Sequence, residues 1–283
     1  MLLSEIEHFL AEDIGYEDYE LFVPPKECTA EIIAKEAGIL AGLEEASQIF
    51  AYLGVQTATK FKDGDAFAAE DVVMRVQGKA HKILKGERLV LNFLSRMSGI
   101  ATLTRTFLNE ARKGNPSVRI AGTRKTTPGF RKYEKKAIII GGGDPHRFGL
   151  FEAVIIKDNH IKIMGLENAI RVAKERASFS KKIEVEVESV EDAIKAAEIG
   201  VDIIMLDNMS VEDVRRCVQT LEERGLRDKV ILEASGGIDL SNVRDYAATG
   251  VDVISSSTLT LNAKSLGFSL EIVNCHPRVA FSP

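Results

Sequence analysis

The sequence predicts an α/β chain in which a barrel of parallel strands follows a smaller α+β domain. Beyond Asn115, short β-branched runs recur between helical stretches, at 118–121, 153–156, 183–187, 203–206, 230–232 and 253–254. These runs contain few alternating polar residues, as expected for parallel strands buried on both faces. In a barrel every strand end opens into one mouth, whereas a doubly wound sheet gathers only the ends near its switch point. Because polar residues follow all six runs, we favour the barrel.

The part of the chain before the barrel reads as an α+β domain joined to a long helix. Helical and β-like segments alternate there, at 2–10, 30–34, 43–53 and 72–76. The long helix is expected from Gly86 to about Lys113. Small residues within it, at Ser98 and Gly99, either admit another backbone at close range or mark a mild kink.

Capping residues support the helices between the barrel strands. Two helices open on the same Ser-Val-Glu-Asp pattern, at 189–192 and 210–213. In this pattern the Ser side chain caps the helix by accepting a main-chain N–H of its first turn. The Asp side chain can in return accept the main-chain N–H of the Ser. Gly200, Gly225 and Gly250 follow three helices at the position that favours a left-handed backbone.

The composition is that of an ordinary globular protein, with 283 residues of which 45% are hydrophobic and 28% charged. We expect an α+β domain with the connecting helix, a catalytic barrel, and a carboxyl-terminal segment that packs back on the first domain, at 1–114, 115–266 and 267–283. No apolar run approaches the roughly 20 residues that cross a bilayer, and the amino terminus lacks a basic signal sequence, so we expect a cytoplasmic protein. The net charge of −5 argues against a general nucleic-acid binder.

The three cysteines give no sign of a shared site. Cys28, Cys217 and Cys275 are far apart and lack CxxC spacing. We therefore predict neither a disulfide framework nor a zinc site. Cys217 falls in an amphipathic helical pattern and is expected in the core.

A basic segment from Arg124 to Arg147 contrasts with the negative net charge of the chain. It contains seven Lys or Arg residues against Glu134 and Asp144, a formal charge of +5. Charge of one sign at this density, beside glycine-rich turns, indicates a site for a ligand with several negative charges.

The basic residues of this segment have two different interpretations. Lys132, Lys135 and Lys136 fit a solvated helix face, which is the usual meaning of a charge run. The pairs at 124–125 and 146–147 lie beside apolar runs, where an unpaired cation is costly unless an anion binds. We therefore expect only these pairs to face a ligand.

Cations, carboxylates and Gly/Ser backbone would meet at the barrel mouth, from Arg124, Lys125, Arg147, Lys157, Glu186, Asp207 and 235–237. Arg and Lys hold carboxylates or phosphates. Carboxylates at Glu186 and Asp207 suit Mg²⁺ or ribose hydroxyls. The amides of Ser235, Gly236 and Gly237, between a strand and a helix start, can form a phosphate cradle.

Two choices stay open on sequence alone. Glu184 and Glu186 share one face of a strand because side chains alternate with a period of two, so the pattern does not rank them. His160 is explained equally well by orienting its own loop and by contacting a substrate.

The motifs resemble those of the quinolinate phosphoribosyltransferase family, the decarboxylating nicotinate-nucleotide pyrophosphorylases of NAD synthesis. They appear in the family's order and spacing, as ER-x-x-LN at 87–92, SGIAT at 98–102, TRKT-x-PG at 123–129, GGG-x-x-HR at 141–147, IKDNH at 156–160, EVEV at 184–187, LDN at 206–208 and EASGG at 233–237. The resemblance implies an amino-terminal α+β domain and an incomplete α/β (TIM-like) barrel. It also implies a homodimer, or a hexamer made of three dimers, with the active site shared across the dimer interface.

The resemblance also implies roles for particular residues. Arg88 would reach quinolinate across the interface, and the substrates would be held further by Thr123, Arg124, Lys125, His146, Arg147 and Lys157. Glu186 and Asp207 would face the ribose and Mg²⁺. The 5-phosphate of phosphoribosyl pyrophosphate would lie against Ser235, Gly236, Gly237 and Ser257. Catalysis is assigned to Lys125, Lys157, Glu186 and Asp207.

The chain departs from the family pattern in two places. Ser257 and Leu261 stand where the family usually has Gly and the His of its phosphate-binding end, and Glu17 and Glu20 replace Gly and Thr. Two alternatives therefore remain. One is a related phosphoribosyltransferase for nicotinate or another acidic base, and the other is a non-catalytic protein that binds an anionic nucleotide or RNA.

Overall fold

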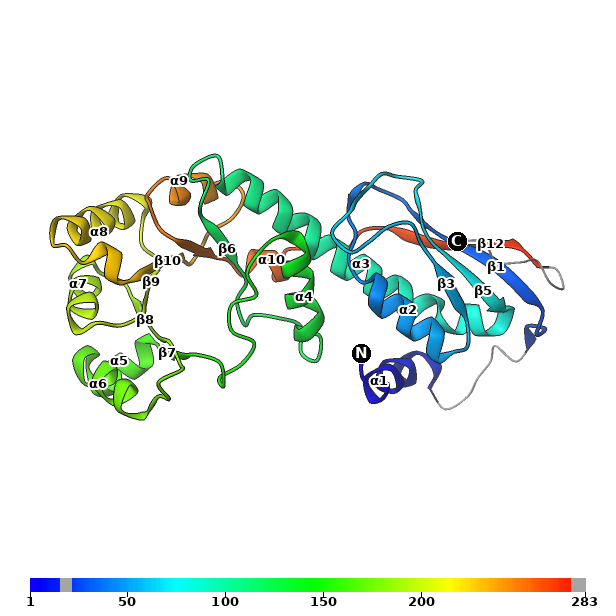
Figure 1. The fold of residues 1–283 in the computed structure, drawn as a ribbon, viewed down its shortest axis with the longest axis horizontal. Coiled ribbons are helices and arrows are strands. Elements are labelled where there is room, and N and C mark those ends of the chain that lie inside the picture. Colours follow the sequence, from blue (N-terminus) through cyan, green and yellow to red (C-terminus); the bar gives the residue numbers. More distant parts are fainter. Residues whose placement is uncertain (16–21, 276–283) are drawn as a thin grey trace. The chain divides into compact units, whose positions relative to one another are not determined.

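The computed structural model describes residues 1–15 and 22–275 (Figure 1). The chain divides into two compact units, one formed by Met1–Leu103 with Ala263–Pro283 and the other by Thr104–Asn262. The substitutions at Glu17 and Glu20 fall outside the described residues. Within the described part of the chain, no helix combines the length and apolar character needed to span a bilayer.

The first unit contains a four-stranded antiparallel sheet in the order β12-β1-β5-β3. Its elements are α1 (Leu3–Ile14), β1 (Glu27–Ala34), β2 (Gly38–Ile39), α2 (Leu43–Tyr52), β3 (Gln56–Ala58), β4 (Ala66–Phe67), β5 (Val72–Lys79) and β12 (Phe268–Asn274). Alternation in β1 buries Ala30, Ile32 and Ala34 on one face. The apolar face of α2 buries Ile49 and Phe50.

A single helix of 32 residues, α3 (Ala80–Ala111), begins earlier than the predicted Gly86. Its small residues permit a close approach of backbone. A Cβ atom at Gly99 would lie 2.0 Å from the carbonyl oxygen of Lys264. The hydroxyl of Ser98 accepts the main-chain N–H of Ala41 at 3.0 Å. The close-approach interpretation of this part of the helix is therefore confirmed.

A disulfide joins Cys28 and Cys275 across 247 residues of sequence, so the prediction of no disulfide was wrong. The two cysteines meet because β1 and β12 pair antiparallel, with Thr29 opposite Asn274. Sequence spacing gives no sign of this pairing, since the two strands belong to opposite ends of the chain. Cys217 is buried and free, as predicted.

We expect reduction of this disulfide to destabilise the protein. A cross-link that closes so long a loop stabilises the folded state by roughly 5 kcal/mol in the chain-entropy model. Urea unfolding with and without reductant should give a clearly lower midpoint under reduction for the wild type. Cys275→Ser should show no effect of reductant, and equal midpoints for the oxidised and reduced wild type would contradict the expectation.

The second unit contains a six-stranded parallel sheet in the order β6-β11-β10-β9-β8-β7. Each strand coincides with one predicted run: β6 (Arg119–Ala121), β7 (Val154–Ile156), β8 (Ile183–Val187), β9 (Ile203–Asp207), β10 (Ile231–Ser235) and β11 (Val253–Ser255). The helical elements are α4 (Arg131–Gly141), α5 (Asp158–Met164), α6 (Leu166–Arg176), α7 (Val190–Ile199), α8 (Val211–Glu223), η2 (Arg227–Lys229), α9 (Val243–Ala247) and α10 (Thr258–Leu261).

The strand order identifies an incomplete barrel. Strands β7 to β11 are neighbours in sequence order and β6 follows β11, so the order never reverses as in a doubly wound sheet. Strands β6 and β7 are the two edges of the sheet. At the β6 edge, Asp144 forms a parallel bridge with Ala121. Helices α6, α7 and α8 follow one another on the outer side of the strands (Figure 1). The predicted fold class is confirmed.

The predicted helix signals act as expected. The hydroxyl of Ser189 accepts the N–H of Asp192, and that of Ser210 accepts the N–H of Asp213, both at 3.1 Å. The three predicted glycines have positive φ angles, at Gly200 (84°), Gly225 (65°) and Gly250 (93°). These caps fix where each helix begins and ends, and so where each strand end points.

Candidate active site

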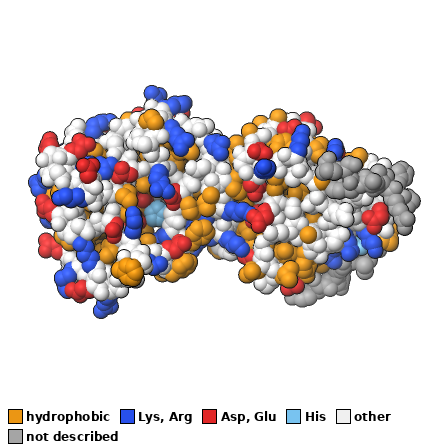
Figure 2. Space-filling view, viewed as in Figure 1, with side chains coloured by type: hydrophobic (Ala, Val, Ile, Leu, Met, Phe, Trp, Pro, Cys, Tyr) orange, Lys and Arg blue, Asp and Glu red, His pale blue; other side chains and the backbone are white. Residues whose placement is uncertain are grey.

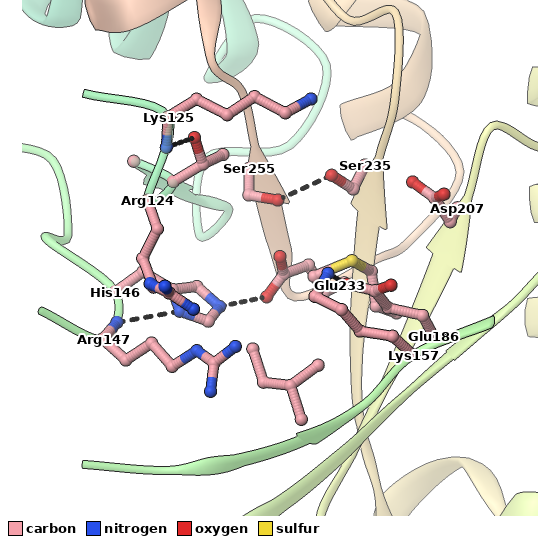
Figure 3. A pocket seen from close by; sticks show the side chains of 14 residues that line it. Arg124, Lys125, His146, Arg147, Lys157, Glu186, Asp207, Glu233, Ser235 and Ser255 are labelled. Carbon is pink, nitrogen blue, oxygen red and sulfur yellow. Dashed lines mark hydrogen bonds and ion pairs between the residues drawn. The ribbon is translucent and has the colours of Figure 1, made fainter. Parts of the chain in front are cut away.

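A cavity of about 290 Å³ lies at the carboxyl ends of the parallel strands in the second unit. Nine residues predicted for the site line it: Thr123, Arg124, Lys125, His146, Arg147, Lys157, Glu186, Asp207 and Ser235. On the molecular surface, Lys and Arg side chains gather around a recess in which histidine atoms are visible (Figure 2). The close-up shows Arg124, His146 and Arg147 on one side of the cavity and Lys157, Glu186 and Asp207 on the other (Figure 3).

Strand register explains why these side chains converge. Glu186 of β8 lies opposite Met205 of β9, and Met205 lies opposite Glu233 of β10. Two residues further along, Asp207 lies opposite Ser235. Alternate residues of a strand face the same side, so all five side chains face the interior of the barrel.

A second cavity of about 210 Å³ adjoins the first and contains the predicted phosphate cradle. Ser235, Gly236, Gly237 and Ser257 all line it. The two cavities share several residues, among them Asp207. A ligand with one charged group in the first cavity and a phosphate in the second would therefore lie alongside Asp207.

The two arginines of the cavity offer donors that no other described residue takes. The Nε atoms of Arg124 and Arg147 are buried without a hydrogen-bond partner. Arg147 is only 7% exposed, and its Nη1 donates to the carbonyl of Ala153 at 3.0 Å. Burial lowers the pKa of Arg147, and the nearby charge of Arg124 lowers it further. An anionic ligand bound to the two guanidinium groups would relieve this repulsion.

The opposite wall carries the two predicted metal ligands. Glu186 forms an ion pair with Lys157. Asp207 accepts a hydrogen bond from the side-chain amide of Asn208 at 2.9 Å, and Asn208 adopts a left-handed backbone with φ 55°. A Cβ atom at Gly236 would lie 2.3 Å from that amide oxygen, so the turn requires glycine there. Two hard carboxylates at neighbouring strand ends fit Mg²⁺, which shares its coordination with water and substrate oxygens.

Two models of known protein families match this chain. The model "Quinolinate phosphoribosyl transferase, C-terminal domain" matches residues 100–271, and the model of the N-terminal domain matches residues 17–98. The chain belongs to the quinolinate phosphoribosyl transferase family.

Relatives match this chain over nearly their whole length. The probable nicotinate-nucleotide pyrophosphorylase [carboxylating] of Methanothermobacter thermautotrophicus is 46% identical, covering 96% of this chain and 99% of the relative. The protein of the same name from Archaeoglobus fulgidus is 50% identical, covering 89% and 96%. The crystal structure of NadC from Streptococcus pyogenes superposes with a TM-score of 0.88 at 38% identity, covering 96% of each chain.

Two buried carboxylates of this family member were not assigned from the sequence. Glu186 lines the cavity, whereas Glu184 is 0% exposed and does not. Glu233 lines the cavity at 2% exposure, 3.1 Å from the imidazole of His146. Burial and, to a lesser extent, the charge of Glu233 raise the pKa of Glu184 to about 8. The sequence did contain a signal for both residues, since each is an acidic residue inside an apolar strand. Acidic residues are rarely buried without a partner, so such a position indicates a functional role.

Further residues outside the predicted site set also line the cavities, among them Met205, Ser255 and Asn208. Met205 and Ser255 line the first cavity, and Asn208 lines the second. The hydroxyl of Ser255 donates to that of Ser235 at 3.0 Å. Alternation along the strands indicates Met205 and Ser255, since they share the period of the predicted residues. Asn208 directly follows Asp207, but its left-handed backbone is not visible in the sequence.

The predicted site residue Arg88 and the residue left open between two roles, His160, lie outside both cavities. Arg88 is an exposed residue of α3 in the first unit and lines neither cavity. His160 accepts the main-chain N–H of Lys157 through Nδ1 at 2.9 Å, at the start of α5. This contact agrees with the interpretation that His160 orients its own loop.

One residue of the basic segment was placed wrongly. Lys135 was expected on a solvated helix face, but it is 0% exposed. Its ammonium donates to the carbonyl of Pro145 and lies 5.5 Å from the ring centre of Phe148. Burial and, to a lesser extent, the charge of Arg131 lower the pKa of Lys135 to about 8. Lys135 thus supports the loop that precedes His146 instead of facing water.

The lowered pKa of Lys135 predicts a pH-dependent stability. Its folded-state value of about 8 is below the ordinary 10.5, so the unfolded chain binds more protons between these values, and stability rises with pH there. From pH 8 to 10, the free energy of unfolding should increase for the wild type relative to Lys135→Met, as measured by urea denaturation. Lys132→Met, at an exposed position of the same helix, should show no such trend. A pH-independent difference for Lys135→Met would contradict the prediction.

Proposed function

We propose that this chain transfers the phosphoribosyl group of phosphoribosyl pyrophosphate to quinolinate, giving nicotinate mononucleotide, CO₂ and pyrophosphate. This is the activity of a nicotinate-nucleotide pyrophosphorylase [carboxylating], the name that its relatives carry. The observation that carries the proposal is the cavity itself. It brings two arginines with unpaired buried donors opposite two carboxylates, next to a glycine-serine cradle.

Each wall of the cavity would hold one part of the reactants. Arg124 and Arg147 match the two adjacent carboxylates of quinolinate, because guanidinium groups bind carboxylates in a planar fork. Lys125 lines both cavities and would neutralise pyrophosphate or phosphate. Ser235 and Gly236 offer the hydroxyl and amide donors that suit the 5-phosphate.

The reaction needs positioning and charge more than a nucleophilic side chain. The bond from ribose C1 to pyrophosphate breaks, and positive charge develops on the sugar while the pyridine nitrogen bonds to C1. Glu186 and Asp207 would stabilise that positive charge, and Lys125 and Lys157 would stabilise the departing and bound anions. The carboxylate next to the nitrogen then leaves as CO₂, and its bonding electrons stay on that ring carbon, beside the positive nitrogen. A proton from water then adds to this carbon, so the product keeps its pyridinium ring.

We propose that Glu186 and Asp207 also hold Mg²⁺. When bound, the ion would offset the charge of the pyrophosphate leaving group. The hard oxygen donors of the two residues favour this ion over softer metals.

The phosphate end carries this chain's own departure from the family motif. Ser257 lines the second cavity, so its hydroxyl would add a donor for the 5-phosphate where the family has Gly. Leu261 is 60% exposed and lines neither cavity. A leucine there offers no donor, so the remaining hydroxyls and amides would hold the phosphate.

We further propose the assembly and location that the family resemblance implies. Arg88 would complete the quinolinate site of a second subunit in a homodimer, or in a hexamer of three dimers. The protein would act in the cytoplasm, where NAD synthesis takes place. The Cys28–Cys275 disulfide is uncommon in a reducing cytosol and would have to resist reduction there.

A substrate comparison tests the reaction. The protein is incubated with Mg²⁺, phosphoribosyl pyrophosphate and either quinolinate or nicotinate, and mononucleotide and CO₂ are measured. Quinolinate should be consumed with release of CO₂. Turnover of nicotinate alone would favour the related transferase, and salt-sensitive RNA binding without turnover would favour the non-catalytic alternative.

Asp207 should be needed for turnover. Asp207→Asn removes a negative charge beside the developing sugar cation, so kcat/KM should fall by about a hundredfold or more. Asp228→Asn, at an exposed position of η2, makes the same chemical change away from the cavity and should leave kcat/KM unchanged. Steady-state kinetics with quinolinate measures both variants, and an Asp207→Asn enzyme of wild-type activity would overturn the assignment.

A further inference from the structure

Both ring nitrogens of His146 are engaged inside the protein. Its Nδ1 accepts the main-chain N–H of Arg147 at 2.8 Å, and its Nε2 lies 3.1 Å from Oε2 of Glu233 (Figure 3). A nitrogen that accepts an amide hydrogen carries no proton of its own, so the proton of the neutral ring is on Nε2. The ring therefore donates to Glu233 and accepts from Arg147.

This tautomer argues against a metal ion at the same place. The ligand atoms of His146, Glu184 and Glu233 lie within 4.8 Å of one another, close enough to surround one cation. Coordination through Nε2 would move the ring proton to Nδ1, where it would face the N–H of Arg147. Histidines that bind metals donate from the other nitrogen to an acceptor, which is the reverse of the contact here.

The charged form of the ring meets the same obstacle. Burial lowers the pKa of His146, while the hydrogen bond and charge of Glu233 and the charge of Glu184 raise it, and the net pKa is raised. A second proton would have to be on Nδ1, against the N–H of Arg147. The contact of Nδ1 with the Arg147 N–H therefore favours the neutral Nε2–H ring.

The backbone holds His146 in a conformation that few residues adopt. Its φ is 54°, and its N–H donates to Oδ1 of Asp144 at 2.7 Å. Asp144 is fixed in turn by an ion pair with Arg119 at 2.6 Å and by its bridge to Ala121. A left-handed non-glycine residue persists only where its surroundings enforce it, and such residues cluster at functional sites.

We infer that His146 is a positioning residue for Arg147, anchored by Glu233, and does not itself bind the substrate. The ring connects β10 to the backbone amide that begins Arg147. Among described residues, the guanidinium of Arg147 has one direct anchor, the carbonyl of Ala153, and its Nε is unpaired. The direction of the Arg147 guanidinium therefore depends on the position of the main-chain nitrogen of Arg147. This inference rests on the proposed function and assigns His146 a part in holding quinolinate through Arg147.

A double-mutant cycle separates positioning from direct contact. Quinolinate binding is measured by isothermal titration calorimetry, without phosphoribosyl pyrophosphate. His146→Ala should weaken binding about tenfold, because it leaves the buried N–H of Arg147 and the carboxylate of Glu233 unpaired. In an Arg147→Ala background the same change should have little further effect. A tenfold loss in both backgrounds would show that His146 contacts quinolinate itself and would overturn the inference.

Two variants serve as controls. His146→Asn should recover most of the lost affinity, because its amide oxygen can accept the Arg147 N–H and asparagine tolerates the left-handed backbone. In a Lys157→Ala background, where no contact with His146 is affected, His146→Ala should still cost about tenfold. Loss of the His146→Ala effect in this background as well would count against a specific link to Arg147.

The tautomer is tested independently of any substrate. The chain has five histidines, so ¹⁵N-histidine labelling gives a tractable spectrum, with His146→Asn identifying the signal. At pH 8 the His146 ring should show an unprotonated Nδ1 and a protonated Nε2. A proton on Nδ1 would overturn the inference. Failure of the wild type to bind quinolinate would instead count against the proposed function, and the tautomer alone would then decide the inference.

Discussion

The parallel register of β8, β9 and β10 is the constraint on which the site depends. It aligns Glu186, Met205 and Glu233 in one layer and Asp207 with Ser235 in the next. A slip of one residue in any strand would turn its polar side chains away from the interior, since side chains alternate with a period of two. The capped helices between the strands keep this register by fixing where each connection ends.

Two cations of the cavity wall lack hydrogen-bond partners at one nitrogen each. The Nε atoms of Arg124 and Arg147 are buried without a partner among the described residues. Buried charges of this kind reduce stability, and residues at functional sites often do so. A dicarboxylate would offset the repulsion between Arg124 and Arg147, so part of the binding free energy comes from relieving a cost already present in the fold.

The sequence predicted the layout of the barrel well because both of its signals are local. Buried parallel strands are apolar runs, and the residues after each run reach the mouth whatever the rest of the chain does. The burial depth of a side chain and its contacts with distant parts of the chain are not local properties, so the sequence did not predict them. Lys135 is buried because Pro145 and Phe148 fold over it, and Glu184 and Glu186 differ only in how far down the strand they lie. Cys28 and Cys275 meet only through the pairing of β1 with β12.

The placement of β12 has a consequence for how the protein is made. The first unit takes three strands of its sheet from before the barrel sequence and the fourth, β12, from after it. A ribosome therefore releases the whole barrel before the edge strand that completes the earlier sheet. Until then β1 exposes an unpaired edge, which is the feature of nascent sheets most prone to wrong pairing. Once it has formed, the Cys28–Cys275 disulfide holds the late strand against β1.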